Sequence, residues 1–177
     1  MEETQQADAQ QANAPRIAVL FVGNPLMLDD GVGPEVYERL VAAYDFPENV
    51  DLYNVGCMSM DMINLVNKYD FMLTVDAIEG TGEAPGTVFS YEPDDVARRD
   101  VPMSSLHELK LADLFDAAAL LGYESEGLCL GMQVENASPA NLCQGLSPAV
   151  EEKIPFLMET VVAVLTNRGF PPVQKKA

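Results

Sequence analysis

Two aspartates and the only histidine are the residues of this 177-residue chain best suited to hydrolysis or metal binding. Asp30 follows an apolar run at residues 16–22, and Asp76 ends a second apolar run at residues 71–75. His107 lies in a loop-like segment just before a helical pattern. Two carboxylates and one imidazole form an incomplete coordination set that leaves positions for water or substrate, and imidazole suits nickel, zinc and iron.

Each of these residues also has an ordinary structural explanation. An Asp near a helix start or at a strand end commonly caps that element, and this explanation suits Asp29 best. A lone His is usually structural or merely exposed. The chain contains neither an HExxH pair nor a GxSxG elbow. Cys57 and His107 could form a nucleophile pair, but we expect Cys57 to be a buried structural residue.

The elements that position these residues alternate between strands and helices. Apolar runs of strand length predict strands at residues 16–22, 50–55, 71–75, 87–91 and 128–134. One helical pattern begins at Val32, and others cover residues 60–67, 109–121 and 148 to about 167, with Ser59 and Ser147 as expected N-caps. Pro155 predicts a kink within the last helix.

This alternation predicts an α/β fold, a three-layer αβα sandwich around a twisted, mainly parallel sheet of about five strands. Sites in such sheets form beyond the carboxyl ends of the strands. Asp30 and Asp76 each follow or end a strand, so we expect both at that edge.

Length and composition favour one domain. Apolar residues make up 48% of the chain, which is enough for a sizeable core. We expect a disordered tail at residues 1–15, a single α/β domain at 16–169 and a second tail at 170–177. The chain lacks an apolar run of membrane-spanning length, and its first residues lack the basic and apolar regions of a secretion signal. We therefore expect a cytoplasmic protein with no membrane partner.

Charge and cysteine content exclude further classes. The net charge of -18 would repel phosphates, so a nucleic-acid partner is not expected. An acidic surface is compatible with a protein partner or a cation, or simply with solubility. Three cysteines without a CxxC pair predict reduced thiols in place of disulfides or a structural zinc site.

The segment from Gly23 to Pro34 joins the first strand to the first helix and contains three glycines. A nucleotide-binding loop is one interpretation of such a segment. GxGxxG and GK[ST] are both absent, however, and the adjacent Asp29 and Asp30 would repel a phosphate.

The sequence GNPLMLDDGVGPEV in this segment resembles the opening signature of the hydrogenase maturation endopeptidases. The resemblance continues in order from about Ile17 to Leu165. It runs through VDA at 75–77, PGTV at 85–88, EPDDV at 92–96, SLH at 105–107, LGMQ at 130–133 and GLSP at 145–148.

This resemblance implies a peptide hydrolase of aspartic or metal-dependent type. Family members remove a C-terminal extension from the precursor of a nickel-iron hydrogenase large subunit after nickel insertion. The three residues implied to contact that nickel correspond to Asp30, Asp76 and His107. Some members have Glu in place of Asp30, and Asp is the shorter ligand.

The resemblance also implies a substrate-recognition loop and a mechanism. Asn54, Gly56 and Cys57 lie where members carry a glycine-containing recognition loop, although the common Asp-Gly-Gly form is absent. The substrate's nickel would fix the scissile bond, and a water would attack without a covalent intermediate. Asp30 or Asp76 could be the general base. Nickel is therefore expected from the substrate, with no tightly bound resident cofactor, and the protein is expected to be a monomer.

Three alternatives remain open at this point. The first is a non-catalytic chaperone or binding module for maturing metalloproteins. The second is a flavodoxin-like domain that binds a nucleotide or another small molecule. The third is a related peptidase that acts on a different precursor.

Overall fold

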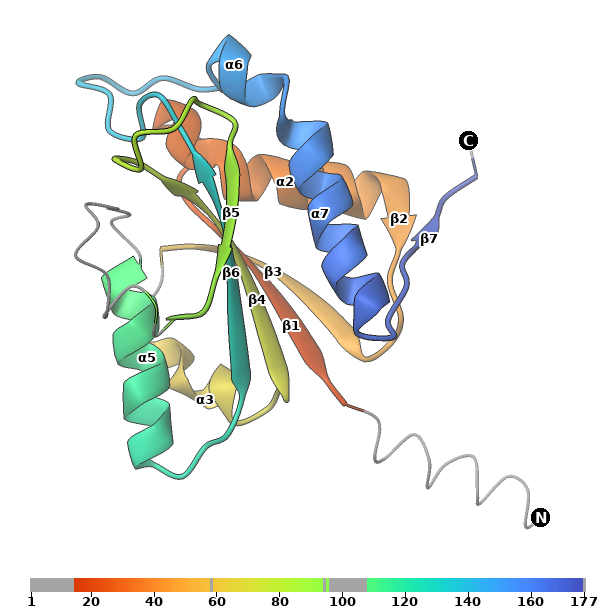
Figure 1. Ribbon diagram of the computed structural model, residues 1–177. Helices are drawn as coiled ribbons and strands as arrows, with labels where there is room; N and C mark the ends of the chain where they lie inside the picture. The colour runs from red at the N-terminus through yellow and green to blue at the C-terminus, as the bar shows by residue number, and fades with distance from the viewer. Residues whose placement is uncertain (1–14, 58, 94, 96–107, 177) are drawn as a thin grey trace.

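A five-stranded sheet forms the centre of the computed structural model, which describes residues 15–57, 59–93, 95 and 108–176 (Figure 1). In spatial order the strands are β3 (Val50–Gly56), β1 (Ile17–Val22), β4 (Phe71–Ile78), β6 (Glu126–Gln133) and β5 (Val88–Tyr91). The first four are parallel and β5 is antiparallel to β6. The prediction of a mainly parallel sheet of about five strands is confirmed.

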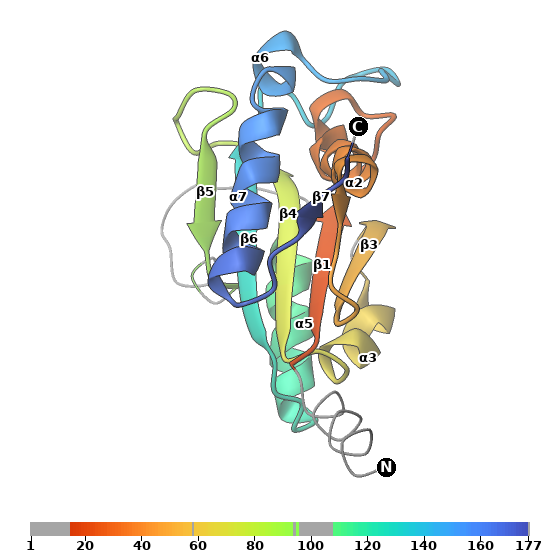
Figure 2. The ribbon, with the colours of Figure 1, turned by 90° about the vertical axis from the view of Figure 1, so that its right-hand side faces the viewer.

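Helices cover both faces of this sheet (Figures 1 and 2). One face is covered by α2 (Val32–Ala43) and α7 (Ile154–Asn167), and the other by α3 (Ile63–Val66) and α5 (Glu108–Leu120). The predicted three-layer architecture is therefore confirmed.

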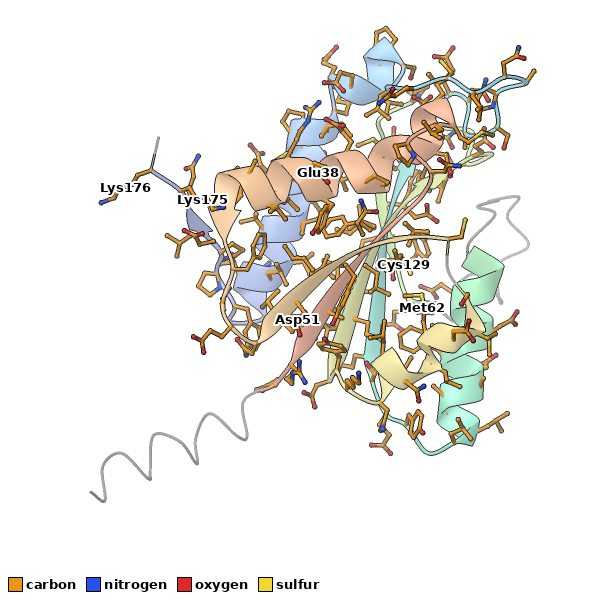
Figure 3. All side chains as sticks on the ribbon, turned by 180° about the vertical axis from the view of Figure 1, so that it is seen from behind. Glu38, Asp51, Met62, Cys129, Lys175 and Lys176 are labelled. Atoms are coloured by element: carbon orange, nitrogen blue, oxygen red, sulfur yellow. The ribbon has the colours of Figure 1, made fainter. Side chains whose placement is uncertain are left out.

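The first strand shows why its sequence is continuously apolar. All six residues of β1 are buried, and alternate side chains point to opposite faces of a strand. Val19 and Phe21 enter the core beneath α2 and α7, while Leu20 enters the core beneath α3 and α5. The second core also contains Cys129, and the partly buried Met62 packs against it (Figure 3).

The described residues also contain several short elements. They are the 3-10 helices η1 (Leu28–Gly31) and η2 (Met60–Met62), the helix α6 (Pro148–Glu151), and the strands β2 (Tyr44–Asp45) and β7 (Val173–Gln174). As predicted, Ser59 is the N-cap of η2 and accepts a hydrogen bond from the Asp61 N–H. β7 falls within the segment 170–177, and it pairs antiparallel with β2.

The final helix differs from its prediction because it breaks into α6 and α7. Lys153 is the N-cap of α7, and Pro155 lies in its first turn. Proline has no N–H to donate and its ring restricts the preceding residue, so it suits a first turn better than a helix interior. The predicted kink at Pro155 is therefore a complete interruption.

Two global properties follow from the described residues. None of the helices among them combines the length and apolarity needed to cross a membrane. All three cysteines lie in the described part of the chain, and none of them forms a disulfide there, as predicted.

Candidate active site at the carboxyl edge of the sheet

Asp30 lies in η1, between the end of β1 and the start of α2, and is only 7% exposed. Its Oδ2 accepts a hydrogen bond from the Asn24 N–H at 2.8 Å. Gly23 begins the loop between β1 and η1 with a φ of 129°. A Cβ at this position would lie 1.8 Å from the Asp30 carbonyl oxygen. Only glycine therefore permits Asp30 to approach the end of β1 this closely.

A second contact fixes the loop that carries Asp30. Met27 forms a parallel bridge with Cys143. The Leu28 N–H donates to the Cys143 carbonyl at 2.7 Å, and the Cys143 N–H donates to the Leu26 carbonyl at 2.9 Å. Segments more than a hundred residues apart in the chain are thus joined beside the candidate site.

Asp76 lies inside β4, and the prediction that it ends the strand is wrong. β4 continues to Ile78 because Ala77 and Ile78 still pair with β6. On its other side β4 pairs with β1 only as far as Val75. The Ala77 N–H lies beyond that ladder and donates to Asp76 Oδ1 at 2.8 Å. Asp76 is 4% exposed, so its carboxylate is held at the point where β1 ends.

The structure places Asp30 and Asp76 at the same edge of the sheet, because η1 packs beside β4. His107 lies outside the described residues. Within the described part of the chain, no three His, Cys, Asp or Glu side chains gather as a potential metal site. The metal-ligand set predicted from the sequence includes His107. The coordination role of this set therefore stays a prediction.

The proposed recognition segment lies at the end of β3, the edge strand. Asn54 and Cys57 are exposed, and Gly56 has a φ of 61°. The Gly56 carbonyl accepts from the Gly23 N–H at 2.8 Å, which joins this segment to the Asp30 loop. The expectation of a buried Cys57 is wrong, because this residue follows the last residue of an edge strand and lies in a bend beyond the sheet.

Asp29 is a buried residue whose role the sequence did not reveal. Its carboxylate has no accessible surface, and no side-chain capping bond is made at the start of η1 or α2. Instead it accepts from the N–H groups of Glu135 and Asn136, at 3.3 and 3.2 Å. It also accepts from the Ser147 N–H at 2.7 Å and hydroxyl at 3.0 Å. The simple cap interpretation is wrong.

Neighbouring loops are fixed in a similar way. Glu79 Oε1 accepts from the Ala137 N–H at 3.0 Å. Gln133 is buried; its Oε1 accepts from the Thr81 N–H at 3.0 Å, and its Nε2 donates to the Val134 carbonyl at 2.6 Å. The candidate site therefore lies among loops that side-chain acceptors attach to one another.

Comparison with known proteins identifies the family. Residues 34–164 match a family model described as hydrogenase maturation protease. This chain belongs to the hydrogenase maturation protease family.

Individual family members match over most of their length. The Hydrogenase 2 maturation protease of Escherichia coli K12 is 31% identical over 163 residues, covering 92% of this chain and 98% of that protein. The hydrogenase expression/formation protein HupD of Rhizobium leguminosarum bv. viciae is 32% identical over 161 residues, covering 88% and 77%. The solved structure of the hydrogenase maturating endopeptidase HybD from E. coli has a TM-score of 0.79 at 29% identity, covering 90% and 98%.

The match to the hydrogenase maturation protease family thus agrees with the resemblance noted in the sequence. The matched range includes Asp76 and position 107, whereas Asp30 lies just before it. The roles predicted for Asp30, Asp76 and His107 come from the resemblance, through the opening signature, VDA at 75–77 and SLH at 105–107.

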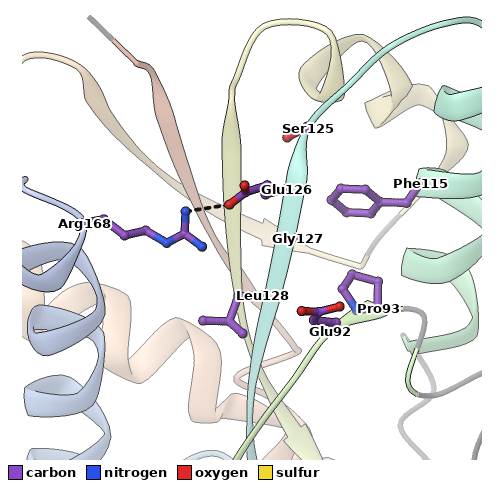
Figure 4. A pocket seen from close by; sticks show the side chains of 8 residues that line it. All are labelled: Glu92, Pro93, Phe115, Ser125, Glu126, Gly127, Leu128 and Arg168. Atoms are coloured by element: carbon purple, nitrogen blue, oxygen red, sulfur yellow. Dashed lines mark hydrogen bonds and ion pairs between the residues drawn. The ribbon is translucent and has the colours of Figure 1, made fainter.

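A cavity of about 410 Å³ lies at the opposite, amino edge of the sheet (Figure 4). Phe115, Pro93 and Leu128 are among the residues that line it. At its rim Arg168 pairs with Glu126 at 2.8 Å, and the Arg168 guanidinium lies 3.4 Å from the centroid of the Phe71 ring. Neither Asp30 nor Asp76 lines this cavity, so it is separate from the candidate site.

Proposed function

We propose that this protein is an endopeptidase that removes the C-terminal extension from the precursor of a nickel-iron hydrogenase large subunit. Membership of the hydrogenase maturation protease family supports the reaction class. The observation that carries the proposal is the placement of Asp30 and Asp76, two nearly buried carboxylates, at one edge of the sheet.

The substrate's nickel would contact Asp30, Asp76 and His107. One oxygen of each carboxylate accepts a backbone N–H, from Asn24 for Asp30 and from Ala77 for Asp76. Such bonds fix the orientation of a carboxylate before a metal arrives. The exposed segment with Asn54, Gly56 and Cys57 would contact the polypeptide near the scissile bond.

The proposed hydrolysis uses a water molecule and no covalent intermediate. Asp30 or Asp76 accepts a proton from the water as its oxygen bonds to the peptide carbonyl carbon. The C–N bond then breaks, and the proton passes to the departing amine. This assignment corresponds to an enzyme of aspartic or metal-dependent type, in which the bound nickel fixes the register of the scissile bond.

We further propose that the enzyme works as a cytoplasmic monomer, without a tightly bound resident metal. A site that must release its nickel-bearing product should bind free metal weakly. Metal analysis of the purified protein and its mass in solution test these two statements. Stoichiometric metal after purification would contradict the first, and a dimer at micromolar concentration would contradict the second.

The central experiment compares precursor loaded with nickel and precursor free of nickel. Purified enzyme is incubated with each, and the mass of the large subunit is measured. We expect a shortened subunit only from the loaded precursor, and equal cleavage of both would contradict nickel recognition. Binding without any cleavage would favour the non-catalytic chaperone. His107→Ala with full activity would remove His107 from the ligand set.

A further inference from the structure

The carboxylate of Asp29 joins three segments of the chain at the edge where Asp30 lies. It belongs to η1, and its four donors come from Glu135 and Asn136, which follow β6, and from Ser147, which precedes α6. We call these four residues the Asp29 clamp. A buried carboxylate with four donors is well satisfied, and removing part of such a network leaves buried polar groups without partners.

Ser147 shows that the clamp is more than ordinary helix capping. It occupies the N-cap position of α6, where a serine oxygen usually accepts an N–H from the first turn. Here the Ser147 side chain makes no capping bond, and its hydroxyl donates to Asp29 Oδ2. In place of a local capping bond, this side chain makes a hydrogen bond to a residue 118 positions away in the chain.

The clamp and the Met27–Cys143 bridge are two separate sets of contacts that hold the Asp30 loop. Asp30 itself accepts from Asn24, which lies just beyond the end of β1. The preceding residue, Gly23, donates its N–H to the Gly56 carbonyl at the end of β3, so the Asn24 amide belongs to the sheet side of the loop and its bond to Asp30 reports any displacement of η1. The position of η1 relative to the sheet, and so of Asp30 relative to Asp76, depends on contacts such as those of Asp29 and Leu28.

We propose that Asp29 is a positioning residue, which holds η1 so that the Asp30 carboxylate stays in place relative to Asp76. The kinetic part of this inference rests on the proposed function, because Asp30 acts on the precursor there. Displacing a reacting group by about 1 Å can reduce a rate about 10²-fold.

Three substitutions test the clamp. Asp29→Asn keeps the size of the side chain, but it replaces one acceptor oxygen with an NH2 group. That NH2 group would then face N–H or O–H donors, to which it cannot bond. Ser147→Ala removes only the hydroxyl bond, and Ser147→Thr returns a hydroxyl. Asp51→Asn is the matched control, because Asp51 also accepts from several groups, Arg16 and Tyr69, but lies toward the amino edge.

The first readout is cleavage of nickel-loaded precursor. We expect kcat to fall about 10²-fold for Asp29→Asn and about 10-fold for Ser147→Ala, with KM little changed. Ser147→Thr should restore most of the activity, and Asp51→Asn should retain it. Unchanged kcat in folded Ser147→Ala, or no recovery in Ser147→Thr, would overturn the proposal.

The second readout needs no substrate. The Asn24 amide proton donates to Asp30, and the Ala77 amide proton donates to Asp76, so their NMR resonances report the two carboxylates separately. We expect the Asn24 resonance to move in Asp29→Asn and Ser147→Ala while the Ala77 resonance stays.

A lower melting temperature with an unmoved Asn24 resonance would show a purely structural role and overturn the proposal. If the wild-type protein does not cleave precursor, the proposed function fails, and the Asn24 resonance still decides the role of Asp29. If Asp29→Asn does not fold, Ser147→Ala provides both readouts.

Discussion

The two edges of the sheet hold their acidic side chains in different ways. At the carboxyl edge, Asp29, Asp30 and Asp76 accept hydrogen bonds from backbone N–H groups. Toward the amino edge, Asp70 also accepts a backbone N–H, from Arg16, but Asp51 pairs with the Arg16 guanidinium and Glu126 pairs with Arg168. Backbone donors orient a carboxylate without adding a positive side chain, whereas an arginine neutralises it.

This difference separates acids that serve stability from acids that are suited to chemistry. The amino-edge pairs close the starts of β1, β3 and β6, where Arg16 also lies 4.9 Å from the centroid of the Tyr69 ring. The carboxyl-edge acids are nearly or fully buried and are held by loops. Substitutions at one edge should therefore alter catalysis, and those at the other should alter only the free energy of unfolding.

Isosteric replacement of an acid at each edge should give the largest contrast. Asp30→Asn or Asp76→Asn removes a candidate general base and nickel ligand, so kcat for precursor cleavage should fall about 10²- to 10⁴-fold. Asp51→Asn should leave kcat unchanged and lower the free energy of unfolding by about 1 kcal/mol. Kinetics and urea unfolding of the three proteins measure this. Full activity in both Asp30→Asn and Asp76→Asn would contradict the proposed functional difference between the two edges of the sheet.

Glycine substitutions should give the next largest contrast. Gly23→Ala would place a Cβ 1.8 Å from the Asp30 carbonyl oxygen at a φ of 129°, so the loop must move. We expect a loss of about 3 kcal/mol of unfolding free energy, together with most of the cleavage activity.

Gly122→Ala is the matched control for that variant. Gly122 also has a positive φ, 77°, but no atom of the described residues lies within 4 Å of an added Cβ. It should lose about 1 kcal/mol through backbone strain alone and keep its activity. Equal losses of activity in the two variants would show that backbone strain, and not displacement of Asp30, is responsible.

The sequence predicted the sheet well because each central strand is buried on both faces, which produces continuous apolar runs such as residues 17–22. The same topology explains why the positions of Asp30 and Asp76 could be anticipated. The end of β4 could not be predicted, because β4 continues to pair with β6 beyond the point where its pairing with β1 ends. Nothing near Asp29 in the sequence indicates its partners, which lie 106 to 118 residues away.

The smallest effect expected is a change in pH dependence at Tyr69, near the amino edge. Its hydroxyl donates to Asp51 Oδ2 at 2.6 Å and also contacts the Tyr53 hydroxyl. Burial, followed by the hydrogen bond to Asp51, raises the pKa of Tyr69. The unfolded chain therefore loses this proton at a lower pH than the folded protein does, since its pKa is about 10.

Stability from Tyr69 should consequently be fully present below about pH 10 and be lost as the pH rises further. Tyr69→Phe should be less stable than wild type at pH 8, and the difference should narrow by pH 11. Urea unfolding at the two pH values measures it, with Tyr123→Phe as the control, because Tyr123 lies outside the Asp51 network. A difference that is constant with pH would mean that Tyr69 contributes through packing alone. In either case cleavage at pH 8 should be unchanged, as expected for a network that serves stability.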